Sequence, residues 1–197
     1  MKLSNKFTFV RVFFAPVFFV LYFLPIWTGK FTVLSLAVAI PCLIFSEFTD
    51  YLDGYYARKH NEVSDFGKIF DPFADVVLHL TSFACLMFSY NGNIHYMPIY
   101  IFILIMLREY SQIFLRMTCV QKGTVIAARK GGKIKTVMYI TAEFYAVFLE
   151  LLVRLDAIPA YFGTLKSISF VLFVVCLIMS YVSFVDYLIH FGKILKQ

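Results

Sequence analysis

The chain has 197 residues, of which 61% are hydrophobic and 19% aromatic, and its mean hydropathy is +0.79. Soluble domains are typically about 45–50% apolar, so this composition excludes an ordinary soluble protein and indicates a membrane protein. The net charge is +6, but the basic residues gather in short segments between apolar runs, and this distribution argues against a nucleic-acid partner.

Apolar runs of about 20 residues, the length that a helix needs to cross the hydrocarbon core of a bilayer, recur along the whole chain. They lie at 7–27, 31–51, 71–90, 96–118, 136–154 and 165–190. The sequence therefore predicts an all-α polytopic membrane protein with six transmembrane helices in a single domain, residues 1–197. The first run is too long for a removable signal peptide and lacks a small-residue cleavage site, so we expect it to remain as a span.

Lysine and arginine are unevenly distributed along the chain. They gather at both ends and in the segments 54–69 and 116–135, whereas 91–97 has none. The positive-inside rule therefore places both termini and both basic segments on the cytoplasmic side, and an even number of spans agrees with this. A short interfacial segment leading into the first span is expected to hold Lys2, Lys6 and Arg11.

Four aspartates stand where the second apolar run ends and the third begins, at Asp50, Asp53, Asp71 and Asp75. Positions three or four apart share one face of a helix, so the first two form one acidic stripe and the last two another. Two such helices facing each other would gather four carboxylates, and carboxylate oxygens are the ligands that Mg²⁺ and Mn²⁺ prefer. A pair of divalent cations is therefore the predicted cofactor. The alternative, a solvated loop charge, suits Asp65, which lies outside both stripes.

The segment from Asp50 to Asp75 follows the spacing Asp-x2-Asp-Gly-x2-Ala-Arg-x8-Gly-x3-Asp-x3-Asp. Eight residues are fixed in this pattern, so a chance match in one short chain is negligible. The segment resembles the signature of the CDP-alcohol phosphotransferase family. The resemblance implies the fold of that family, a homodimer, and a reaction in which an alcohol hydroxyl attacks a CDP-linked donor and CMP leaves.

The resemblance also implies roles for the residues of the motif. It assigns Asp50, Asp53 and Asp71 as ligands of two Mg²⁺ or Mn²⁺ ions, and Asp75 as the general base and a further metal ligand. A two-metal site screens the charge of a pyrophosphate and stabilises both the attacking and the leaving oxygen. Small residues of the motif leave room for a phosphate or a base. The residues expected to bind the CDP-lipid are Asp53, Gly54, Ala57, Arg58 and Gly67.

The chain is expected to turn back between the two acidic stripes over the polar segment 58–68. Pro72 disfavours helical geometry at Asp71 and prefers the first turn of a helix. We therefore expect a helix to start or kink at this proline.

Two further titratable residues lie one helical turn from the acidic stripes. His79 follows Asp75 by four positions, and Glu47 precedes Asp50 by three. The histidine is interpreted as either a proton relay or a hydrogen-bonded packing residue, and the glutamate as either a support for the metal ligands or a packing residue.

Basic residues in and after the fourth apolar run form a second informative group, Arg108, Arg116, Lys133 and Lys135. Glu109 follows the first arginine, and both lysines belong to the segment Gly-Lys-Ile-Lys-Thr at 132–136. These residues resemble one branch of the family, the bacterial phosphatidylglycerophosphate synthases. The acceptor in that branch, sn-glycerol 3-phosphate, is a small dianion that needs arginine or lysine donors. We therefore expect the four basic residues to bind the acceptor phosphate.

Other interpretations of this second group stay open. Arg108 and Glu109 would also suit a structural ion pair, and the two lysines would suit topology signals alone. Val76 and Tyr139 stand where that branch commonly has a lysine and a glutamine. Inositol phosphate, serine, choline and phosphatidylglycerol therefore remain alternative acceptors. The last two apolar runs are expected to add only hydrophobicity.

The sequence, with the resemblance, predicts transfer of a phosphatidyl group from CDP-diacylglycerol to glycerol 3-phosphate. We expect the protein among the lipids of the bacterial cytoplasmic membrane, with its active site on the cytoplasmic side. A small ion- or proton-coupled transporter is a rival from another class, but its acids would lie along a pathway rather than in one cluster. A structural or assembly protein would leave the acidic cluster unexplained.

Overall fold

The structure is a computed structural model, and it describes residues 3–59, 65–124 and 130–192. Within helices it describes the backbone alone for residues 3–7, 50–51, 53–59, 65–66, 68 and 130.

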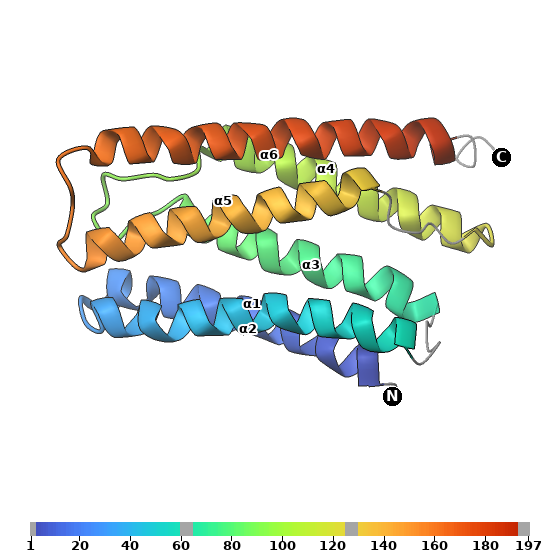
Figure 1. Ribbon diagram of the computed structural model, residues 1–197, viewed down its shortest axis with the longest axis horizontal. Helices are drawn as coiled ribbons and strands as arrows, with labels where there is room; N and C mark the ends of the chain where they lie inside the picture. The colour runs from blue at the N-terminus through green and yellow to red at the C-terminus, as the bar shows by residue number, and fades with distance from the viewer. Residues whose placement is uncertain (1–2, 60–64, 125–129, 193–197) are drawn as a thin grey trace.

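Six α-helices make up the described chain, and no strand occurs in these residues. They are α1 (Leu3–Thr28), α2 (Thr32–Lys59), α3 (Asp65–Leu86), α4 (Ile99–Gln121), α5 (Lys130–Arg154) and α6 (Phe162–Phe191). Each helix contains most of one predicted apolar run, and all six lie lengthwise in one elongated bundle (Figure 1). The third and fourth runs extend beyond their helices, because α3 ends at Leu86 rather than at 90 and α4 begins at Ile99 rather than at 96. The all-α prediction is therefore confirmed.

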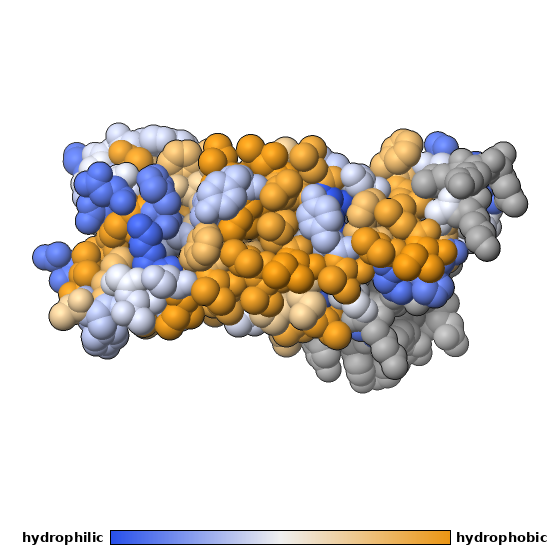
Figure 2. Space-filling view, turned by 90° about the horizontal axis from the view of Figure 1, so that it is seen from above, coloured by the Kyte–Doolittle hydropathy of each residue, from blue (hydrophilic) through white to orange (hydrophobic). Residues whose placement is uncertain are grey.

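The surface of the bundle is that of a protein in lipid. Apolar side chains cover most of the middle of one face, whereas hydrophilic side chains gather towards an end (Figure 2). Phe13 and Ile189 are 67% and 68% exposed, whereas Arg11 and Arg154 are 1% and 5% exposed. Lipid tails accept apolar side chains, and ionisable groups in a membrane protein turn inward. The protein is therefore a polytopic membrane protein.

Five helices are long and apolar enough to cross a membrane, and α4 is not among them. It is long enough, at 23 residues, but it contains Arg108, Glu109 and Arg116. It runs beside the others within the bundle (Figure 1). Arg108 and Glu109 are buried, so these two charges face protein rather than lipid. The count of six spans stays a prediction.

The helix ends near the acidic motif and near the basic segments lie at one end of the bundle (Figure 1). At this end of the bundle α2, α4 and α6 end, and α1, α3 and α5 begin. The lysine and arginine distribution predicted that the basic segments lie on the same side of the membrane. This prediction is confirmed, because the helix ends next to these segments lie at one end of the bundle.

Two predictions about the acidic hairpin need correction. Helix α2 continues to Lys59 and α3 already begins at Asp65, so the turn is shorter than the predicted segment 58–68. Pro72 lies inside α3, so the helix does not start there, and the alternative, a kink at this proline, stays a prediction. Membrane helices tolerate an internal proline because neighbouring groups satisfy the freed carbonyl, and α1 and α2 contain prolines in the same way.

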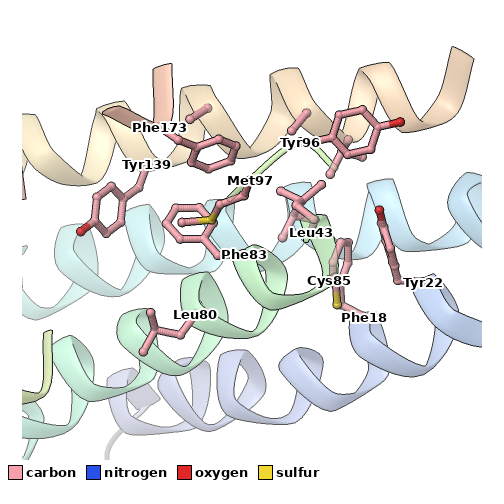
Figure 3. Packing of buried hydrophobic residues seen from close by; sticks show 14 of the residues in the cluster. Phe18, Tyr22, Leu43, Leu80, Phe83, Cys85, Tyr96, Met97, Tyr139 and Phe173 are labelled. Carbon is pink, nitrogen blue, oxygen red and sulfur yellow. The ribbon is translucent and has the colours of Figure 1, made fainter. Parts of the chain in front are cut away.

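Aromatic packing joins α3, α5 and α6 at the centre of the bundle. Phe83, Tyr139 and Phe173 lie together there (Figure 3). The ring of Phe83 is 5.2 Å from that of Tyr139 and 5.3 Å from that of Phe173, both edge to face. This geometry is favourable for aromatic pairs, so it fixes α5 against α3 beside the acidic stripe.

A buried ion pair holds the opposite end of the bundle together. Arg154 donates from Nε to Glu150 Oε1 at 2.8 Å, from Nη1 to Ser35 Oγ at 3.0 Å and from Nη2 to the Tyr22 carbonyl at 2.8 Å. Tyr96 donates to Glu150 Oε2 at 2.9 Å. Burial, and then the Glu150 charge, raise the pKa of Tyr96, so the phenol stays protonated as a donor. The expectation that the last two runs add only hydrophobicity is therefore wrong.

Candidate active site

The acidic side of the site lies on α3, and α1 supports it. Asp71 and Asp75 are one turn apart in a continuous helix, so the predicted second stripe is confirmed. Thr8 of α1 donates to Asp71 Oδ1 at 2.6 Å, and Arg11, one turn further along α1, forms an ion pair with Asp75. Arg11 was expected in an interfacial segment, but it is buried and belongs to the site.

The first acidic stripe lies in the last turns of α2, the helix that runs to Lys59. Because the backbone there is helical, Asp50, Asp53, Gly54 and Ala57 lie on one face, as predicted. The side chains of these residues and of Arg58 lie outside the described part. Gly67 is buried within α3 rather than in the predicted turn.

A contact between Glu47 of α2 and His79 of α3 shows that the acidic ends of these two helices lie side by side. Glu47 Oε1 lies 3.9 Å from His79 Nδ1. Glu47 precedes Asp50 by one turn, and His79 follows Asp75 by one turn, so the two stripes face the same region. The four carboxylates would offer an all-oxygen ligand set, which fits Mg²⁺ or Mn²⁺.

His79 has a second carboxylate partner, on α5. Its Nδ1 lies 2.9 Å from Glu143 Oε2, and both side chains are buried. The histidine ring also packs edge-on against Tyr139, with ring centroids 5.8 Å apart. The hydrogen bond expected of His79 is thus confirmed, and its role as a proton relay stays a prediction. Glu47, His79 and Glu143 form a compact group, in which the carboxylate oxygens and the ring nitrogen lie within 4.8 Å of one another.

The basic side of the site is a pocket of about 550 Å³ between α3, α4, α5 and α6. Its lining includes the general base predicted from the resemblance and the four basic residues expected to bind phosphate, namely Asp75, Arg108, Arg116, Lys133 and Lys135. The two charged groups lie far apart in the sequence. The fold nevertheless brings them to one cavity, and their individual roles stay predictions.

Glu109 organises three donors at the wall of this pocket. Arg108 Nη1, Lys135 Nζ and Tyr139 Oη each lie 2.8 Å from Glu109 Oε1. The Arg108–Glu109 ion pair that was an alternative interpretation therefore exists, and Arg108 lines the pocket as well. A carboxylate that accepts three donors fixes the positions of both cations, which prepares them for an anion.

Arg116 is held from the other side of the pocket by α6. Its Nη2 donates to Tyr187 Oη at 3.1 Å, and its guanidinium lies over the same ring, 5.4 Å from the centroid. No sequence signal pointed to Tyr187, because one more tyrosine in an apolar run is common in membrane helices. Glu143 was also missed, although a carboxylate within a span is itself a signal of function.

The profile of the CDP-alcohol phosphatidyltransferase family matches residues 1–191. The chain belongs to this family. The family resemblance predicted from the acidic motif is therefore confirmed, and the protein is a transferase. The transporter and assembly-protein interpretations are left without support.

Several bacterial proteins are similar to the chain. The CDP-diacylglycerol–glycerol-3-phosphate 3-phosphatidyltransferase of Treponema pallidum (strain Nichols) is 34% identical, over 100% of this chain and 92% of that protein. The protein of the same name from Bacillus subtilis (strain 168) is 34% identical, over 68% of this chain and 70% of the relative. A probable phosphatidylglycerophosphate synthase of Mycobacterium tuberculosis (strain CDC 1551 / Oshkosh) is 32% identical, over 68% of this chain and 60% of the relative.

Proposed function

We propose that the protein transfers the phosphatidyl group of CDP-diacylglycerol to sn-glycerol 3-phosphate, giving phosphatidylglycerol phosphate and CMP. The observation that carries this proposal is the pocket that Asp75 shares with Arg108, Arg116, Lys133 and Lys135. A carboxylate suits a reacting hydroxyl, and four cations suit a phosphate dianion on the same small molecule. The names of the relatives support the same pair of substrates.

Asp50, Asp53, Asp71 and Asp75 would hold two divalent cations, Mg²⁺ or Mn²⁺. Bound there, the cations would screen the pyrophosphate and polarise the attacking hydroxyl. Thr8 supports this arrangement, because its hydrogen bond orients Asp71. The CDP-lipid would lie along the same face, against Asp53, Gly54, Ala57, Arg58 and Gly67.

Asp75 would accept the proton of the acceptor hydroxyl as the new O–P bond forms and the bond from phosphorus to the CMP oxygen breaks. Arg11 contacts Asp75 and holds it in place, so we assign it as a positioning residue. The acceptor phosphate would bind to Arg108, Arg116, Lys133 and Lys135, which leaves its far hydroxyl free to reach Asp75. This arrangement fixes one end of the acceptor and presents the other for reaction.

The four cations favour an acceptor that carries a phosphate dianion over serine and choline, which have no phosphate, and over phosphatidylglycerol, whose phosphodiester has a single negative charge. An assay of CMP release with a panel of acceptors tests this preference. Glycerol 3-phosphate should be used fastest, and inositol phosphate is the competitor with matching charge. Preferential use of serine or choline would contradict the assignment of the basic pocket.

The protein would lie in the bacterial cytoplasmic membrane as a homodimer, with the acidic end of the bundle towards the cytoplasm. The basic segments at that end support the orientation. The connection between α3 and α4, which contains the exposed residue Asn93, lies at the opposite end of the bundle (Figure 1). A cysteine placed at Asn93 should therefore react with a membrane-impermeant reagent outside intact cells, and one placed at Lys122 should not. The reverse pattern would contradict the orientation.

A further inference from the structure

Gln112 of α4 has a buried side-chain amide. The residue is 5% exposed and lines the 550 Å³ pocket. Neither Nε2 nor Oε1 has a hydrogen-bond partner among the described residues. A buried amide without partners is unfavourable, and buried polar side chains in native proteins are nearly always hydrogen-bonded. We therefore expect the amide to form hydrogen bonds with a molecule that binds in the pocket.

The position of Gln112 within the pocket indicates what this partner is. Arg108 lies one turn before it on α4 and Arg116 one turn after it, and both line the same pocket. Asp75 lines the pocket from α3. The amide thus stands among the groups proposed to bind the acceptor phosphate, in the pocket that also contains the proposed base.

The chemistry of an amide suits a hydroxyl. It is uncharged and offers both a donor and an acceptor, so it pairs with a hydroxyl, which also has both, while a phosphate dianion takes donors only. In sn-glycerol 3-phosphate the phosphate is on C3 and the attacking hydroxyl is on C1. The hydroxyl on C2 lies between them and does not react.

We propose that Gln112 binds the C2 hydroxyl of the acceptor and so selects a glycerol phosphate over phosphorylated alcohols that lack this group. The inference rests on the proposed function, because it takes the phosphate site and the base as assigned above. Tyr139 stands where a glutamine is common in the branch that the chain resembles, and its hydroxyl is bound to Glu109. Gln112 supplies an amide to the pocket from a different helix.

A pair of acceptors tests the proposal directly. 3-Hydroxypropyl phosphate has the length, charge and primary hydroxyl of glycerol 3-phosphate but lacks the C2 hydroxyl. The wild-type protein should use it with a kcat/KM lower by about 10- to 100-fold, because the buried amide would be left unpaired. Equal use of both acceptors by the wild type would overturn the proposal.

The variant Gln112→Met keeps the length of the side chain and removes both hydrogen-bonding groups. Its kcat/KM for glycerol 3-phosphate should fall by a similar factor, while its kcat/KM for 3-hydroxypropyl phosphate should stay within about threefold of the wild-type value. Ser111→Ala, an exposed neighbour on α4, is the matched control and should leave both values unchanged. If Gln112→Met reduced the use of both acceptors equally, Gln112 would have no part in binding the C2 hydroxyl.

Gln112→Asn provides a second variant, because it keeps the amide but withdraws it by one methylene. It should discriminate between the two acceptors less than the wild type does, and discrimination at the wild-type level would overturn the proposal. A different result would show that the proposed function itself is wrong. In that case the wild type would use neither acceptor while it still released CMP with another alcohol.

Discussion

Arg11 of α1 and Asp75 of α3, which are 64 positions apart in the sequence, form an ion pair, and the Arg11 side chain is buried. A guanidinium next to a carboxylate stabilises the ionised carboxylate and limits its rotation. The residue proposed as the base is therefore oriented by a cation of the protein itself. This pairing also ties α1 to the catalytic end of α3.

We predict that Arg11→Ala lowers kcat by about 10- to 100-fold, because a base displaced by about 1 Å loses its alignment with the acceptor hydroxyl. Arg11→Lys should recover part of the rate, since it keeps the charge but not the shape of the guanidinium. Steady-state kinetics would measure both, with Lys30→Ala, an exposed residue of the α1–α2 connection, as the control. An unchanged kcat in Arg11→Ala would show that Asp75 needs no such support.

Removal of the divalent cation should abolish activity. Excess chelator should stop CMP release by the wild type, and added Mg²⁺ or Mn²⁺ should restore it. Asp71→Asn should remove activity in the presence of metal, because it replaces one proposed ligand oxygen by an amide nitrogen that cannot bind a cation. The variant should insert into the membrane and melt near the wild-type temperature. Full turnover in chelator would refute the metal site.

Loss of a phosphate-binding cation should weaken the acceptor more than the donor. Arg116→Ala or Lys135→Ala should raise the KM for glycerol 3-phosphate by roughly 10- to 150-fold, since a desolvated charge-assisted hydrogen bond contributes about 1.5–3 kcal/mol. The KM for CDP-diacylglycerol should stay within a few-fold. Lys166→Ala removes a lysine of α6 that does not line this pocket and should change neither value. A selective rise in the donor KM would reassign these residues to the nucleotide.

Disruption of the buried pair at the far end should affect stability rather than chemistry. Arg154→Met leaves Glu150 buried without its cation, which typically destabilises a protein by about 3–5 kcal/mol. Thermal unfolding in detergent would report this as a lower Tm, while kcat of the folded fraction stays near that of the wild type. An unchanged Tm would mean that the hydrogen bonds of Ser89 and Tyr96 are enough to hold Glu150.

The helices were predictable because bilayer thickness fixes the length of apolar run that each span needs. Helix-period spacing also predicted that Asp71 and Asp75 share a face, and the fixed spacing of the motif predicted the family. Of the two expectations at Pro72, a helix start or a kink, the start is wrong, because a proline that interrupts a soluble helix is tolerated inside a membrane helix.

Pairings between distant residues were beyond the sequence alone. Arg11 and Asp75 meet only because α1 packs on α3, and His79 and Glu143 meet only because α5 packs on α3. Gln112 gave no signal at all, since a single glutamine on a helix is ordinary until its amide is seen to be buried without a partner.

A stoichiometric assay of the purified wild type and of Asp75→Asn, with CDP-diacylglycerol and glycerol 3-phosphate as the substrates, tests the proposed reaction and its base together. The wild type should release one CMP for each phosphatidylglycerol phosphate formed, and Asp75→Asn should form neither product although it still binds both substrates. Release of CMP without formation of the phospholipid, or wild-type turnover by Asp75→Asn, would contradict the proposed reaction and its base.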